Sequence, residues 1–179
     1  MAPHPNARGF SAVEIAAGFA ILGSLVAVAV PTAVREMHAS RLVEPAEGLA
    51  AIAQGAVMYA TGRSVADAFP HSVGLTPSSP PRGKLQADPP GTWSDPTWRA
   101  LGFPIPGSGF DFAAGEPHAF AFSFDSVSGA ARSTFVGAAH ADLDGDGTLS
   151  TFEIRGHAVS PAAGGAAVEP GIYVESELE

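Results

Sequence analysis

The sequence predicts an α+β fold in which a long N-terminal helix packs on a small antiparallel β-sheet head. An apolar run occupies residues 10–30, and helical spacing of apolar side chains continues through residues 31–62. From residue 118 the pattern turns to strands, and Phe120, Phe122 and Phe124 alternate with small residues with a period of two. Helical segments followed by alternating strands are typical of a helix laid on an antiparallel sheet. This division leaves residues 1–9 as a leader and residues 63–117 as a proline-rich loop region.

The apolar run from Phe10 to Val30 has the length of a membrane-spanning helix. Its 21 residues would extend about 31 Å, close to the hydrocarbon thickness of a bilayer. The only charge in the run is Glu14, and a carboxylate inside such a segment costs roughly 2.5–3.5 kcal/mol on insertion scales. Cleavage after Gly9 would give Phe10 a new α-ammonium one helical turn away, which could pair with Glu14 in the same chain or in a neighbour.

These N-terminal residues resemble those of type IV pilins and the related pseudopilins. The resemblance rests on the short leader ending at Gly9, the Gly9–Phe10 junction, Glu14 and the apolar helix, with Pro31 where that family commonly has a kinking proline. It implies cleavage after Gly9 by a prepilin peptidase, methylation of Phe10 and docking of Glu14 among other pilin subunits in a helical filament. It also implies single-pass insertion in the bacterial inner membrane, and after assembly a location in the periplasm or at the cell surface.

Two other interpretations of the N-terminus stay open. Ala27-Val28-Ala29 is a small-x-small pattern that a signal peptidase accepts, so the run could be a secretory signal peptide. The run could also be a plain signal anchor in which Glu14 has no role. The length of the run and its carboxylate argue against an ordinary signal peptide.

Composition excludes several classes of function. The net charge is −9 with nine Lys and Arg residues, so we expect no nucleic-acid partner. The chain has no cysteine, which excludes a disulfide, including the C-terminal disulfide loop of many pilins. The six histidines match no zinc spacing and are expected to be scattered on the surface. No nucleophile elbow or phosphate-binding loop is present, and we predict no enzyme.

Residues 31–62 predict an amphipathic continuation of the helix that ends at Thr61-Gly62. Its apolar stripe is expected to pack under the head's own sheet and consists of Leu42, Leu49, Ile52, Ala56 and Tyr59. Pro31 and Pro45 should bend or break the helix because each removes a backbone donor. Gly48 and Gly55 should weaken it further.

The proline-rich region predicts little regular structure, and Leu75–Pro90 is expected to be a mobile, extended loop. One short helix is predicted at Pro96–Leu101, with Ser94 or Asp95 as its cap. Three apolar residues in and after it are predicted to belong to the core: Trp98, Leu101 and Phe103. Alternatively, Trp93 and Trp98 form a patch for a carbohydrate or a partner protein.

From residue 118 the pattern predicts strands. Phe120, Phe122 and Phe124 alternate with small residues, Asp125–Gly129 is a turn candidate, and Ser133–Ala141 returns as the second strand of a hairpin. Phe152–Val159 and Ile172–Val174 are further strand candidates.

Residues 142–153 match the twelve-residue EF-hand calcium loop. The pattern places Gly147 at the sharp turn and predicts these oxygen ligands for Ca²⁺: Asp142, Asp144, Asp146, the Thr148 carbonyl, Ser150 through water, and both oxygens of Glu153. Hard oxygen ligands suit calcium better than zinc. The alternative is an acidic turn that binds no metal.

The residues before this loop, Thr134–Ala141, predict a strand and not the entering helix of a paired EF-hand. We therefore expect a loop that staples one edge of the head, with Leu149 anchoring it to the core and a Kd on the order of 10⁻⁴–10⁻³ M. The resemblance agrees, because major pseudopilins of type II secretion and some type IV pilins use calcium in this way.

Three functions follow as hypotheses. The favoured one is a structural subunit of a type IV pilus or pilus-like filament with a calcium-stabilised head. The second is a pseudopilin of a type II secretion system. The third, of another class, is a secreted or membrane-anchored calcium-binding protein that does not polymerise.

Overall fold

The computed structural model describes residues 11–107, 111–160 and 165–176, and for residues 33–41 it describes the backbone alone. The chain divides into two compact units, Met1–Ser40 and Arg41–Glu179. The architecture is α+β, with an N-terminal apolar helix and a small antiparallel sheet, as predicted.

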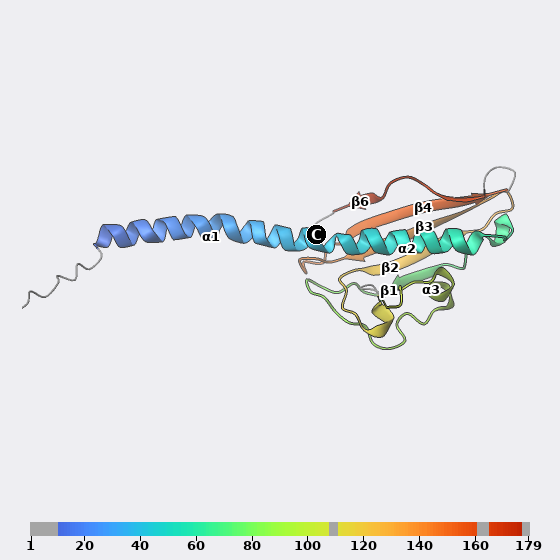
Figure 1. Cartoon of the computed structure of the whole chain (residues 1–179), viewed down its shortest axis with the longest axis horizontal. Helices are drawn as coiled ribbons and strands as arrows, with labels where there is room; N and C mark the ends of the chain where they lie inside the picture. Colours follow the sequence, from blue (N-terminus) through green and yellow to red (C-terminus); the bar gives the residue numbers. More distant parts are fainter. Residues whose placement is uncertain (1–10, 108–110, 161–164, 177–179) are drawn as a thin grey trace, which may run out of the picture. The chain divides into compact units, whose positions relative to one another are not determined.

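Helix α1 (Ala12–Arg41) contains the apolar segment. Residues Ala12–Thr32 form a helix that is long and apolar enough to cross a membrane, and none of that segment is buried. Phe19 is 72% exposed. Pro31 lies inside α1 (blue in Figure 1), which continues past it, so the expected interruption at this proline does not occur.

Helix α2 (Val43–Ala60) ends at the predicted position, and Pro45 lies in its first turn, where a missing backbone donor costs little. The helical assignment is interrupted at Leu42, three residues before Pro45. Gly48 and Gly55 do more than weaken α2. A Cβ on Gly48 would collide with the Phe122 ring, and a Cβ on Gly55 would collide with the Leu101 carbonyl. The two glycines therefore allow close packing of α2.

The head sheet has six strands in the order β1-β2-β3-β4-β5, with β6 also paired to β4, and every pairing is antiparallel. The strands are β1 (Val73–Thr76), β2 (Ala121–Val127), β3 (Arg132–Ala141), β4 (Ser150–Val159), β5 (Ala166–Val168) and β6 (Tyr173–Glu175). Figure 1 shows α2 lying along the face of this sheet. The predicted β2–β3 hairpin is confirmed, with Phe124 opposite Gly137.

Two details of the strand predictions are wrong. The turn predicted at Asp125–Gly129 lies later, because Asp125 pairs with Val136 and β2 continues to Val127. The predicted loop Leu75–Pro90 is partly held in place. Its first residues belong to β1, which pairs with β2, and isolated bridges join Arg82 to Asp142 and Gln86 to His118. Strands β1 and β5 were not predicted.

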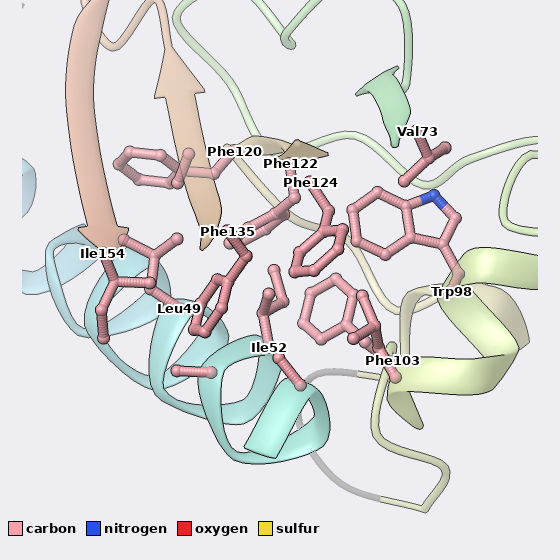
Figure 2. Packing of buried hydrophobic residues seen from close by; sticks show 14 of the residues in the cluster. Leu49, Ile52, Val73, Trp98, Phe103, Phe120, Phe122, Phe124, Phe135 and Ile154 are labelled. Atoms are coloured by element: carbon pink, nitrogen blue, oxygen red, sulfur yellow. The ribbon is translucent and has the colours of Figure 1, made fainter. Parts of the chain in front are cut away.

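The core lies between α2 and the sheet (Figure 2). Leu49 and Ile52 from α2 meet Phe122 and Phe135 from the strands, and Phe135 stacks on Phe124 with ring centroids 5.6 Å apart. The predicted helical stripe is thus confirmed at its centre. Fully burying one such aromatic side chain contributes about 1.5–3 kcal/mol.

Helix α3 (Pro96–Leu101) closes the other side of the core. Asp95 caps it as predicted, because its side chain accepts a hydrogen bond from the Thr97 N–H at 2.8 Å. Trp93 and Trp98 are 7% and 0% exposed, which excludes the alternative that they form a surface patch. Two short 3₁₀ turns, η1 (Val65–Asp67) and η2 (Phe112–Ala114), complete the region.

A carboxylate ties α2 to the start of the sheet. Glu44 accepts hydrogen bonds from the backbone N–H groups of Ala119 and Phe120, the second at 2.8 Å. These groups lie just before β2, whose first residue is Ala121. Glu44 therefore helps to set where α2 meets the sheet.

Candidate metal site in the head and the N-terminal helix

The loop between β3 and β4 brings three carboxylates together. Asp142, Asp144 and Asp146 each offer an oxygen, and these oxygens all lie within 4.8 Å of one another. The backbone can fold this tightly because Gly145 and Gly147 adopt φ angles of +87° and +96°, a region that favours glycine. The three predicted aspartate ligands are therefore gathered at one place.

Asp142 is the buried member of the cluster, with 2% exposure. Its Oδ1 accepts a hydrogen bond from the Gly145 N–H at 2.8 Å. Among the residues that the structure describes, its buried Oδ2 has no hydrogen-bond partner, and the Arg82 Nε lies 3.8 Å away. A buried carboxylate oxygen without a donor is costly, and a bound cation would relieve that cost.

Asp144 and Asp146 are exposed and face the solvent side of the cluster. Each uses one oxygen inside the loop: Asp144 Oδ1 accepts from the Asp146 N–H at 3.0 Å, and Asp146 Oδ1 accepts from the Thr148 N–H at 2.6 Å. The Thr148 hydrogen bond lowers the pKa of Asp146 because it stabilises the charged form. Asp146 is thus favoured in its ionised form.

Ser150 and Glu153, the last two expected ligands, make contacts within the sheet. Ser150 is buried at the start of β4 and donates its hydroxyl to the Ala141 carbonyl, and Glu153 pairs with Arg155 at 2.7 Å. In an EF-hand these positions lead into a helix, but here they lie in a strand, where residues three apart point to opposite faces. The cluster found in the structure consists of the three aspartates, and the roles of Ser150 and Glu153 as ligands stay a prediction.

Leu149 differs from the EF-hand expectation, whereas the ligand role of the Thr148 carbonyl stays a prediction. Thr148 is exposed, and the hydrogen bond described for it is the one from its N–H to Asp146. Leu149 is 39% exposed, whereas Leu143 is 2% exposed and belongs to the core cluster. The residue that anchors this loop is therefore Leu143, at its second position, and not Leu149.

The proline-rich region supplies the other wall of the site. The Gly83 N–H donates to the Asp142 carbonyl at 2.7 Å, and Arg82 forms a parallel bridge with Asp142. Gly83 has a φ of +62°, and a Cβ there would lie 3.4 Å from the Asp144 carbonyl oxygen. This contact between segments 59 residues apart (142 − 83) has no signal in the local sequence pattern.

Three carboxylates with an open, exposed side suit a hard divalent cation that keeps several water ligands. Calcium accepts six to eight oxygens in flexible geometry, so about three protein carboxylates plus water and backbone oxygens form a plausible shell. Thiolate or imidazole ligands, which zinc favours, do not belong to the cluster. The three aspartates therefore form a group that could hold a metal ion, next to residues 82–83.

The N-terminal candidates are only partly described. Gly9 and Phe10, the predicted processing site, lie outside the described residues. Glu14 forms a capping box with Ser11: its Oε2 accepts from the Ser11 N–H at 2.7 Å, while the Glu14 N–H donates to Ser11 Oγ at 3.3 Å. The Ser-x-x-Glu pattern from Ser11 to Glu14 is the sequence signal for this cap.

One histidine departs from the expectation of scattered surface residues. His118 is fully buried, with Nδ1 2.7 Å from the Phe120 carbonyl and Nε2 2.9 Å from Asp88 Oδ2. Trp93 donates to the same Asp88 oxygen at 2.7 Å. Because the pair is enclosed by core aromatics, it fixes the 86–93 segment against η2 and β2, and offers no surface for a substrate.

Comparison of the chain with protein-family models, curated proteins and solved structures gives no match.

Proposed function

We propose that this protein is a structural subunit of a type IV pilus or pilus-like filament, with a head stabilised by calcium. The single observation that carries the proposal is the apolar helix Ala12–Thr32, of which no residue is buried, joined in sequence to an α+β head that has its own core. Such a helix needs a membrane or neighbouring copies to cover it.

Sequence and structure support this assignment in complementary ways. The Gly9–Phe10 junction and Glu14 are the features by which the chain resembles prepilins. A helix packed on one face of an antiparallel sheet is compatible with a pilin-like head. The same features fit a pseudopilin of a type II secretion system, which is a subunit of a shorter filament of the same kind.

We propose calcium as the ion because the β3–β4 loop gathers three aspartates around a buried carboxylate oxygen that lacks a hydrogen-bond partner in the described structure. In a head without cysteine, an ion at this loop replaces a disulfide as the local restraint. It would tie the β3–β4 connection to the segment at Gly83.

A second candidate is a membrane-anchored calcium-binding protein that does not polymerise. The observation that favours it is the Ser11–Glu14 capping box, because Glu14 is satisfied within its own chain and does not require a neighbour. The two candidates differ in whether Gly9 is a cleavage site and whether Glu14 contacts other subunits.

The intact mass of the protein, recovered from bacterial membranes that contain a prepilin peptidase and pilus machinery, tests the proposal. We expect loss of residues 1–9 and one added methyl group, with filaments that Glu14→Ala reduces while Ser11→Ala leaves them largely intact. An uncleaved chain, or a mature chain that begins after Ala29, would refute the filament proposal. Normal filament yield from Glu14→Ala would refute the docking role of the carboxylate.

A further inference from the structure

We propose that Arg82 is a built-in counter-ion of the aspartate loop, and that a divalent cation binds there in competition with its guanidinium group. The inference rests on the calcium site proposed above and adds a regulatory element to it. It concerns the one cationic side chain paired with the buried aspartate among the described residues.

The pairing between Arg82 and Asp142 is electrostatic and loosely held. The Arg82 Nε lies 3.8 Å from Asp142 Oδ2, beyond hydrogen-bond distance, and this oxygen has no hydrogen-bond partner in the described part of the chain. The arginine side chain is 74% exposed while the aspartate side chain is 2% exposed. Arg82 therefore partly neutralises a buried charge without being locked to it.

The backbone at this point is held independently of the arginine side chain. The Gly83 N–H donates to the Asp142 carbonyl at 2.7 Å, so residues 82–83 stay docked on the loop through main-chain contacts. The guanidinium group can then swing into solvent when a cation enters, while the wall of the site remains in place. The Arg82 side chain therefore affects the affinity for the cation, whereas the Gly83 main chain holds residues 82–83 on the loop.

The size of the competition follows from charge and distance. A cation bound 2.3–2.6 Å from the carboxylate oxygens would lie within about 6 Å of the guanidinium group, and a +2 and a +1 charge at that distance in water disfavour binding by about tenfold. Screening by salt reduces this effect. Removing the positive charge should therefore tighten calcium binding about three- to tenfold at low ionic strength.

The test is a calcium chloride titration of the full chain in detergent micelles, followed through the backbone amide signals of Gly145 and Gly147. Arg82→Gln should bind about three- to tenfold more tightly than wild type at low salt, with a smaller difference at high salt. Lys84→Gln is the matched control: it removes the same charge two residues away from a side chain that forms no ion pair in the described structure. It should change affinity less than about twofold. Arg82→Lys keeps the charge and should resemble wild type.

The outcomes separate this inference from the proposed function. Calcium binding by wild type with equal or weaker binding by Arg82→Gln would overturn the inference and leave the calcium site standing. Failure of Arg82→Gln to fold would also overturn it, because Arg82 would then be structural. No binding by either protein would refute the calcium site and the inference together, and binding by Arg82→Gln alone would support competition in its strongest form.

Discussion

Replacing Asp142 by asparagine should abolish the calcium dependence of head stability. The amide keeps the shape of the side chain and its acceptor for the Gly145 N–H, but it removes the one buried carboxylate of the cluster. With a Kd of about 1 mM, wild type in about 10 mM calcium gains RT ln 11, or about 1.4 kcal/mol. That gain corresponds to a rise in Tm of about 3–6 °C for a unit as long as Arg41–Glu179.

The assay is thermal unfolding of the full chain in micelles, followed by tryptophan fluorescence in calcium and in chelator. The readout is the difference between the two conditions within each variant, so any intrinsic effect of the amide on the loop cancels. Asp125→Asn is the matched control because it removes the same charge from an exposed strand position remote in sequence from the loop, and it should keep the calcium increment. An Asp142→Asn protein with the wild-type increment would refute the assignment of the ion to this loop.

The remaining predictions concern the head itself. Gly156→Ala should destabilise the head by about 1–3 kcal/mol in chemical denaturation, because the new Cβ meets the Phe135 ring, whereas Gly74→Ala, with open space around it, should change little. Glu44→Ala should cost about 1–3 kcal/mol because it leaves two backbone N–H groups before β2 without their acceptor; a smaller loss would show that water replaces the carboxylate. Burial lowers the pKa of His140 from its ordinary value of 6.5, and the charge of Glu153 partly opposes this effect. Protonation of the His140 imidazole is therefore less favourable in the folded state than in the unfolded state. The neutral imidazole therefore contributes stability above about pH 6.5 that is lost as pH falls through the folded pKa; His140→Gln should flatten the profile of Tm against pH in this range, and an unchanged slope would contradict the assignment.

Local chemistry accounts for the elements that could be predicted from the sequence. The α3 helix was predicted with its cap because Asp95 and Pro96 act on the residues next to them. The β2–β3 hairpin was predicted because the phenylalanine alternation has the period of a strand. The end of α2 at Ala60 followed from Thr61-Gly62, which break a helix locally.

The candidate metal site shows where such reasoning stops. The spacing of Asp142, Asp144 and Asp146 was sufficient to predict the cluster, because a tight turn brings alternate residues together. The expected roles of Ser150 and Glu153 came from the spacing of the loop pattern alone, and the pairing of β4 with β3 gives both residues contacts within a sheet. The strand sends one of these side chains into the core and the other to Arg155.

The apolar helix, the strand periodicity and the three aspartates can be recognised in the sequence, since each depends on residues within a few positions of one another. The burial of Trp93, the anchoring of the loop by Leu143 and the place of Arg82 beside Asp142 come from the fold of the whole head. These outcomes depend on contacts between segments tens of residues apart, and the free energy of such contacts comes from burial and charge pairing that no local pattern encodes.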